Sequence, residues 1–337
     1  MCEVRGGVSG GSPRVRLPPT DEPGRPGPWP THDLLVPKSR NVCYSLRLMA
    51  KKKLVSVSRS RARRDFLRPG PTPGKAAAFI DGLQSSGRYV FTRNEALRIL
   101  RVSEIALKNA FWRLGKTGRL VSPRRGFYVI VPLEYRATGS VPASWFIRDL
   151  MAYLGRPYYV GLLSAAALHG AAHQSPQEFQ VITDRPLRPI EVGRARIRFV
   201  KKAHLAKSPT VGIKTPTGEV CVSTPEATAL DLVRYPEHAG YLSNVATVLG
   251  ELAERLDAEA LVHAAEADGE PAYAQRLGYL LDRIGLADVA APLADWTRRK
   301  APGVTPLRPD HPTTGAPRDA RWRVAVNEEV ETDGVRT

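Results

Sequence analysis

Long apolar runs are missing from this sequence of 337 residues. A transmembrane helix needs about 18 or more consecutive apolar residues, and no stretch of the chain supplies them. The first residues also lack the apolar segment of a secretory signal peptide. We therefore expect a cytoplasmic protein without membrane contact, whose 42% of hydrophobic residues can bury the cores of about two domains.

Cysteine and common catalytic motifs are scarce as well. Cys2, Cys43 and Cys221 stand far apart in no C-x-x-C pair, which predicts neither a disulfide framework nor a zinc ribbon. The chain has no G-x-x-x-x-G-K-[ST] phosphate loop. No Asp or Glu precedes a Lys by two positions, as many DNA-cleaving domains require. We expect no catalytic residues and no cofactor.

Two histidines four residues apart, His169 and His173, raise the question of a metal site. In H-E-x-x-H this spacing places two zinc ligands on one helix face, with the Glu between them as general base. Here Gly170 replaces that Glu, and Pro176 suggests that the helix ends early. The sequence therefore favours structural histidines and no metal.

Positive charge is concentrated at the N-terminal end. The net charge is +17; residues 1–70 carry 15 Lys and Arg against 5 Asp and Glu, and residues 71–140 carry 12 against 4. Residues 141–337 carry 23 against 24. The first 140 residues are thus predicted to face a polyanion, and the remainder is not.

The N-terminal segment, residues 1–74, is rich in Pro and Gly at first and basic towards its end. It has neither helical nor strand periodicity, which predicts a disordered arm. The stretch from Met49 resembles an ordinary bacterial N-terminus, so we expect that translation starts there.

Residues 75–135 show the element order of a winged helix-turn-helix. An amphipathic helix precedes Gly87, a second begins at Thr92 with a capping box to Glu95, and a third begins at the N-cap Ser103. Two strands then flank the turn 123–126. The third helix would enter the major groove, and the hairpin would reach the backbone or minor groove. The residues predicted to bind DNA are Thr92, Arg93, Asn94, Arg101, Ser103, Lys108, Asn109, Arg113, Lys116, Arg119, Arg124 and Arg125.

The remainder predicts a mixed α/β domain over residues 143–300, followed by a tail over 301–337 partly packed on it. Strands are expected at 179–184, 195–202 and 219–224. Helices are expected at 143–155, which is amphipathic, at 158–170, which is strongly apolar, and after 240. A further helix should begin at Ser223 as N-cap, with Glu226 at the capping-box position. The fold class is therefore α+β, with a large helical part in the second domain.

Several motifs together resemble one known family. The block 89–132, the segment "GLLSAAALHGAAHQSPQ", the segment "STPEATALDLV" and "RWRVAVNEEVE" follow one another as in AbiEi antitoxins. The resemblance implies a bacterial antitoxin of an abortive-infection system. It implies that the winged helix represses its own operon at inverted-repeat promoter DNA and that the second domain counters a nucleotidyltransferase-type toxin. It marks as signature positions His169, His173, Gln174, Ser223, Glu226 and Asp231. Such a protein would be nucleoid-associated.

Two other classes remain open from the residues alone. One is a ligand-sensing winged-helix transcription factor without a toxin partner, and the other, less favoured, is a DNA-processing enzyme. Winged helices also bind proteins, but charge, element order and the hairpin arginines together favour DNA. Capping or ion-pair roles explain the acids Asp184, Glu226 and Asp231.

Overall fold

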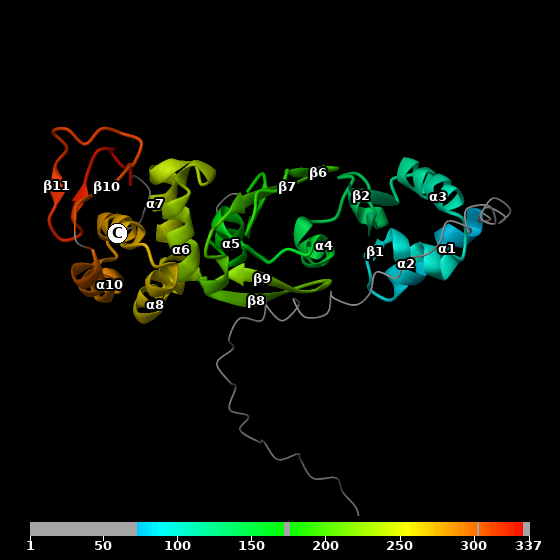
Figure 1. Ribbon diagram of the computed structural model, residues 1–337, viewed down its shortest axis with the longest axis horizontal. Helices are drawn as coiled ribbons and strands as arrows, with labels where there is room; N and C mark the ends of the chain where they lie inside the picture. The colour runs from blue at the N-terminus through cyan, green and yellow to red at the C-terminus, as the bar shows by residue number, and fades with distance from the viewer. Residues whose placement is uncertain (1–72, 172–175, 302, 333–337) are drawn as a thin grey trace, which may run out of the picture. The chain divides into compact units, whose positions relative to one another are not determined.

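The structure of the protein is a computed structural model that describes residues 73–171, 176–301 and 303–332 (Figure 1). The predicted arm therefore lies outside the described residues, apart from its last two positions. The predicted start at Met49 lies outside them too.

Three helices and a small sheet form the first part, coloured blue to green in Figure 1. Its elements are α1 (Pro73–Ser85), β1 (Val90–Thr92), α2 (Arg93–Leu100), α3 (Glu104–Lys116), β2 (Leu120–Arg124) and β3 (Phe127–Ile130). The strands are antiparallel in the order β1-β3-β2. Strand β1 was not predicted from the sequence. It is only three residues long, and it is a strand because it pairs with β3.

The N-caps of α2 and α3 are those predicted, but the Glu95 carboxylate pairs with Arg88 at 2.8 Å, so only the Thr92 half of the predicted capping box forms. The Thr92 hydroxyl accepts a hydrogen bond from the Glu95 amide at 3.3 Å, and the Ser103 hydroxyl accepts one from the Ala106 amide at 3.3 Å. Between the helices Arg101 adopts the left-handed conformation, with φ of 51°. The turn between α2 and α3 is therefore sharp. A compact apolar core that includes Ile80, Phe91 and Phe111 packs the helices against the sheet.

A six-stranded sheet and a group of helices form the rest. The strands are β4 (Tyr158–Val160), β5 (Phe179–Thr183), β6 (Ile190–Val192), β7 (Ala195–Lys201), β8 (Thr210–Thr215) and β9 (Gly218–Ser223). The helices are α4 (Ile147–Leu154), α5 (Leu162–Leu168), α6 (Pro225–Arg234), α7 (Tyr241–Leu252), α8 (Ala258–Asp268), α9 (Pro271–Arg283) and α10 (Ala287–Lys300). Short 3-10 helices lie at Leu133–Tyr135, Ala143–Trp145, Leu205–Lys207, Pro236–His238 and Ala253–Arg255. The described residues are thus mixed α+β.

The sheet has the order β6-β7-β5-β4-β9-β8 and is mixed, because β5 pairs with β7 and β4 with β9 in parallel while the other pairs are antiparallel. Its central strands are buried on both faces. Val181 points into one core with α4 and the hairpin residues Phe127 and Val129. Its neighbour Ile182 points into the other core, which helices α6 to α10 complete. This explains why two adjacent residues of β5, Val181 and Ile182, are both apolar.

The single apolar helix predicted over 158–170 is wrong. The structure has strand β4, then Gly161, then helix α5. A Cβ at Gly161 would lie 2.6 Å from Cγ1 of Ile182, so only glycine allows this close approach to β5. Pairing of Tyr158 and Tyr159 with β5 outweighs the helical pattern of their side chains.

Two further expectations need correction. Thr224, not Ser223, is the N-cap of α6, because Ser223 is the last, fully buried residue of β9. Glu226 accordingly makes no capping box but accepts a hydrogen bond from the Asp257 amide at 3.1 Å. Cys221 is disulfide-bonded, which its distance along the sequence from other cysteines did not predict.

The segment after residue 303 packs on α9. It forms strands β10 (Thr305–Pro306), β11 (Arg318–Asp319) and β12 (Val324–Ala325). Trp322 is buried there, and its indole nitrogen donates to Asp282 Oδ2 at 2.6 Å. Gly278 of α9 lies directly under the indole, where a Cβ would overlap the ring.

We therefore predict that Gly278→Ala destabilises the protein by about 1–3 kcal/mol, because the buried indole must move. The control is Gly82→Ala in α1, where a Cβ meets nothing within 4 Å and the better helix former should be neutral or stabilising. Denaturant unfolding of the full chain measures both. Equal changes in the free energy of unfolding for the two variants would show that the Trp322 indole can move without loss of stability.

Candidate functional site

Helix α3 turns one face to the core and the opposite face to solvent. Leu107, Ala110 and Phe111 are buried. The exposed positions of the helix are Glu104, Ile105, Lys108, Asn109, Trp112, Arg113, Gly115 and Lys116. A helix that fits a groove while packing on a core needs this division.

Five of the predicted DNA-binding residues make contacts within the protein. Thr92 and Ser103 cap helices. Arg93 pairs with Glu104 at 2.7 Å, and Arg119 pairs with Asp81. The guanidinium of Arg124 donates to the Arg188 carbonyl. A DNA phosphate that bound one of these side chains would therefore have to replace its contact within the protein or bind beside it.

The remaining predicted DNA-binding residues have exposed side chains. They are Asn94 of α2, Arg101 at the C-cap of α2, Lys108, Asn109, Arg113 and Lys116 on α3, and Arg125 at the hairpin turn. None of these cations makes an ion pair with an acid among the residues that the structure describes. The backbone of the hairpin turn is held, because the Tyr153 hydroxyl donates to the Arg125 carbonyl at 2.9 Å.

Two apolar residues on the exposed face were missed by the sequence analysis. Ile105 and Trp112 are each 63% exposed, and Lys116 Nζ lies 5.5 Å from the centre of the Trp112 ring. The signal was available, because the two residues are seven apart and fall on the same stripe of a helix.

One arginine of the second half also lies beside the hairpin. The Arg188 carbonyl accepts the hydrogen bond from Arg124, and the Arg188 side chain is exposed. Residues 141–337, although close to neutral in net charge, therefore contribute an exposed cation next to Arg124.

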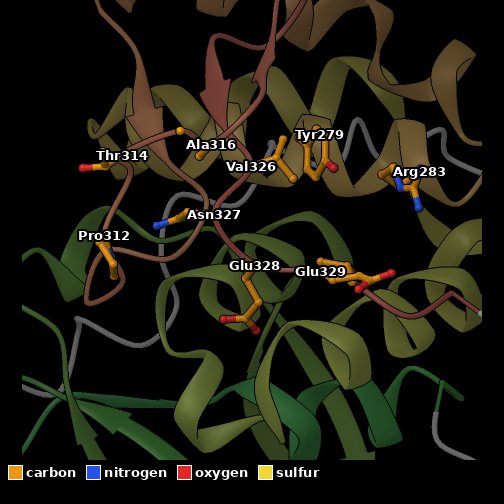
Figure 2. Close-up of a pocket in the computed structure, with 11 residues that line it drawn as sticks. Tyr279, Arg283, Pro312, Thr314, Ala316, Val326, Asn327, Glu328 and Glu329 are labelled. Carbon is orange, nitrogen blue, oxygen red and sulfur yellow. The ribbon is translucent and has the colours of Figure 1, made fainter.

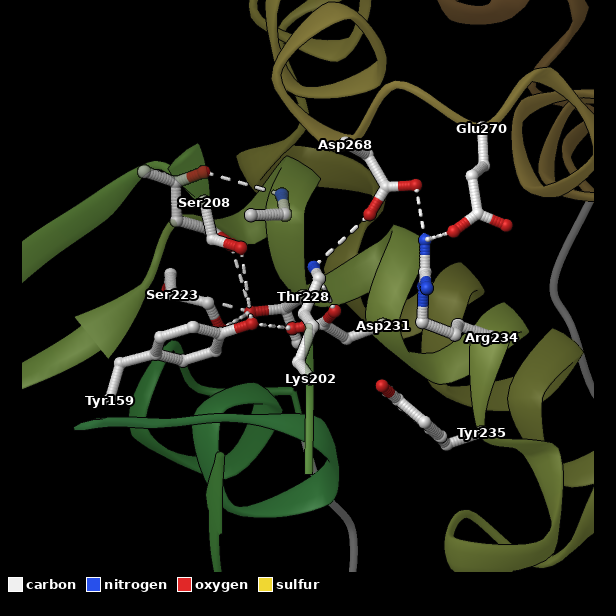
Figure 3. A network of polar contacts seen from close by, with 12 residues as sticks. Tyr159, Lys202, Ser208, Ser223, Thr228, Asp231, Arg234, Tyr235, Asp268 and Glu270 are labelled. Carbon is white, nitrogen blue, oxygen red and sulfur yellow. Dashed lines mark hydrogen bonds and ion pairs between the residues drawn. The ribbon is translucent and has the colours of Figure 1, made fainter. Parts of the chain in front are cut away.

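A network of buried charges occupies the second half (Figure 3). Lys202 directly follows β7, and its side chain is 4% exposed. Its Nζ lies 2.7 Å from Asp231 Oδ1 of α6 and 3.1 Å from Asp268 Oδ1 of α8. Arg234 of α6 completes the chain of contacts, with distances of 2.7 Å to Asp268 and 3.1 Å to Glu270. The network thus ties the sheet to two helices.

Neighbouring groups complete this network. The Tyr159 hydroxyl donates to Asp231 Oδ2 at 2.8 Å. Burial lowers the pKa of Lys202, but the charges of Asp231 and Asp268 outweigh burial and raise it above its ordinary value. Burial, with the adjacent Asp231, raises the pKa of Tyr159 well above its ordinary value. Lys202 is therefore charged and Tyr159 neutral at physiological pH, which suits a fixed structural network.

The signature residues divide between this network and its surroundings. Asp231 is at its centre, and Ser223 shares a 2.6 Å hydrogen bond with Thr228 nearby. His169 is the C-cap of α5, and its Nε2 lies 2.7 Å from the Ser223 carbonyl oxygen. A carbonyl oxygen can only accept a hydrogen bond, so Nε2 carries the proton and donates. His173 and Gln174 lie outside the described residues. No three His, Cys, Asp or Glu among the described residues are grouped to hold a metal.

A shallow pocket of about 510 Å³ lies between α9 and the C-terminal segment (Figure 2). Tyr279 and Arg283 line it from α9, and Asn327 and Glu329 from the C-terminal segment. Glu328, also in its lining, is paired with Arg308 at 2.7 Å. The predicted site residues are not among its lining.

Within the ranges that the structure describes, no helix is long and apolar enough to cross a membrane.

The fold is similar to that of a solved bacterial protein. The crystal structure of the RV2827C protein from Mycobacterium tuberculosis is similar to this chain, with a TM-score of 0.53 and 17% sequence identity. The similarity covers 76% of this chain and 92% of that chain, and at this identity it concerns the fold. No curated protein matches the sequence.

The family follows from the sequence of the second half. Residues 159–283 match the family model of the AbiEi antitoxin C-terminal domain. They include the network of Tyr159, Lys202 and Asp231. Residues 159–283 are therefore similar to the C-terminal domain of AbiEi antitoxins, and over this range the resemblance drawn from the motifs is confirmed. This family is one of antitoxins rather than enzymes, and an antitoxin implies a toxin partner.

Proposed function

We propose that the protein is an antitoxin that represses its own operon. In this proposal residues 75–135 are a winged helix-turn-helix that binds promoter DNA, and residues 143–300 counter a nucleotidyltransferase-type toxin. The match of residues 159–283 to an antitoxin domain carries the proposal. Residues 301–337 are assigned to a C-terminal extension of that domain, and DNA binding places the protein at the nucleoid.

The first part supports DNA binding through its topology and its charge. The order of helices and strands, with α3 after a sharp turn from α2, is that of a helix-turn-helix followed by a hairpin. Lys108, Arg113 and Lys116 are exposed on α3, and Arg125 is exposed at the hairpin turn. Cations in these places suit a major groove and the phosphates beside it.

One such unit reads only a half-site, so an inverted repeat needs two copies of the chain. We therefore assign inverted repeats upstream of the gene as the operator. The test combines two assays on the full chain. Binding to duplexes from the upstream region is titrated in solution, and survival is scored when the protein is expressed with the product of the adjacent gene. Binding of unrelated duplexes with equal affinity would contradict repression of the operon.

We predict that Arg125→Ala weakens binding to operator and unrelated duplexes about equally and reduces the salt dependence. A lost phosphate contact lowers the slope of log K against log salt by about 0.9. Arg125 is a cleaner probe than Arg124, whose guanidinium contacts Arg188. Arg299→Ala, an exposed arginine at the end of α10, is the control and should leave the slope unchanged. An unchanged slope in Arg125→Ala would remove the hairpin from the interface.

The pocket of Figure 2 is the observation that favours a ligand-sensing transcription factor instead. None of its lining residues belongs to α3, and they include Arg283 and Glu329, which could select a polar ligand. The two functions differ in the survival assay. A sensor without a toxin partner gives no protection against the adjacent gene product, whereas an antitoxin does.

A further inference from the structure

The exposed face of α3 has apolar residues at its centre and cations at its edges. Ile105 and Trp112 lie diametrically opposite the buried Leu107 and Phe111 side of the helix. Seven residues separate them, which is about 10.5 Å along the helix axis. Lys108 and Arg113 are exposed on the two sides of this line, about a quarter turn or less away.

Large apolar side chains in this position need an explanation. Each is 63% exposed, and no element among the described residues covers them. A single exposed apolar residue is ordinary, but two on the central line of one helix define a strip.

The charges around the strip indicate its occupant. Lys108, Arg113 and Lys116 border it, and Glu104, the acid on the same helix, is already paired with Arg93 at 2.7 Å. A polyanion with apolar groups at its centre complements this pattern. Duplex DNA has phosphates along both groove edges, and in the major groove the thymine C5-methyl is the exposed apolar group.

We propose that Ile105 and Trp112 contact thymine methyl groups and that α3 therefore selects A·T pairs about three base steps apart. This inference rests on the proposed DNA binding and adds the base class that is read. A spacing of about 10.5 Å along the helix compares with about 10.2 Å for three steps of 3.4 Å along the duplex. Asn109 lies between the two on the same face, and an amide side chain suits the adenine of such a pair.

The test removes the methyl groups from the DNA. The shortest upstream duplex that the full chain binds is prepared with thymine and again with uracil at every thymine position. Uracil keeps the base pairing and lacks only the C5-methyl group. We expect the wild-type protein to bind the uracil duplex about fourfold more weakly for each methyl contact, or about 15-fold for two contacts.

Protein variants assign the effect to the strip. Ile105→Ala and Trp112→Ala should weaken binding to the thymine duplex and bring the thymine-to-uracil ratio close to one when combined. Ile99→Ala is the matched control, since this isoleucine of α2 is 53% exposed and lies outside α3. It should keep the wild-type ratio. Unchanged thermal unfolding would show that the variants fold normally.

Each contrary outcome has a separate meaning. Equal affinity of the wild-type protein for the two duplexes would overturn the methyl contacts while leaving DNA binding intact. A wild-type ratio retained by the double variant would overturn the role of Ile105 and Trp112. A variant that binds DNA normally but no longer self-associates would assign the strip to a second copy of the chain. Failure to bind any upstream duplex would instead reject the proposed function itself.

Discussion

Replacing Asp231 by asparagine is expected to destabilise the protein by about 3–5 kcal/mol, because it leaves Lys202 buried with less compensating charge. Asp231 is fully buried and receives hydrogen bonds from both Lys202 and Tyr159. Asparagine has nearly the same shape, so the loss reports charge rather than packing. Denaturant unfolding of the full chain measures it. Protection against the toxin should fall with the amount of folded protein.

The control is the same substitution at an exposed ion pair. Asp295 pairs with Arg298 on α10 at 2.9 Å, and both side chains are more than half exposed. Asp295→Asn should therefore cost at most about 1 kcal/mol. If both substitutions cost the same, water must reach the Lys202 network.

A double variant gives the sharper result. Lys202→Met combined with Asp231→Asn removes both members of the buried pair, and Asp268 keeps its partner Arg234 at 2.7 Å. We expect the double variant to be more stable than Asp231→Asn alone, because no buried cation is left with a weakened set of partners. A double variant less stable than the single one would show that Lys202 contributes mainly through the packing of its methylene groups.

Loss of repression without loss of protection is expected when Lys108, Arg113 and Lys116 are all replaced by alanine. Each cation is exposed on α3, so the fold should be unaffected. A good base contact contributes about 1–3 kcal/mol, and the triple variant should therefore bind the operator at least about 100-fold more weakly. Repression is measured with a promoter reporter. Protection is measured by survival with the toxin, since the matched antitoxin domain lies in residues 159–283.

A triple variant at the end of α10 matches this change in charge. Arg298, Arg299 and Lys300 are likewise three exposed cations of one helix. Their replacement by alanine should leave repression nearly intact. Loss of protection in the α3 variant at a normal protein level would mean that the two activities are not carried by separate residues.

Local signals in the sequence predicted the first part well. The caps Thr92 and Ser103 depend on residues three positions away, and the buried stripe of α3 depends on its own periodicity. The wrong N-cap predicted for α6 has a non-local cause. Ser223 and Thr224 are both good N-cap residues. The choice between them depends on where β9 ends, and that is set by the pairing of β9 with β8.

The candidate sites show the same division. The cations of α3 follow from the helical pattern, and Ile105 and Trp112 could have been found in the same way. The Lys202 network could not, because its members come from β4, the end of β7, α6 and α8. Lys202 and Asp231 are 29 residues apart in the sequence, and no local sequence pattern predicts their ion pair.

The hairpin turn is fastened at two points to residues outside 75–135. Tyr153 of α4 donates to the Arg125 carbonyl at 2.9 Å, and Arg124 donates to the Arg188 carbonyl. In the proposed function, a ligand of the second half that shifted either attachment would therefore change the free energy of DNA binding. By thermodynamic reciprocity, DNA then changes the affinity for that ligand by the same factor. Residues that act separately can thus still belong to one coupled binding equilibrium.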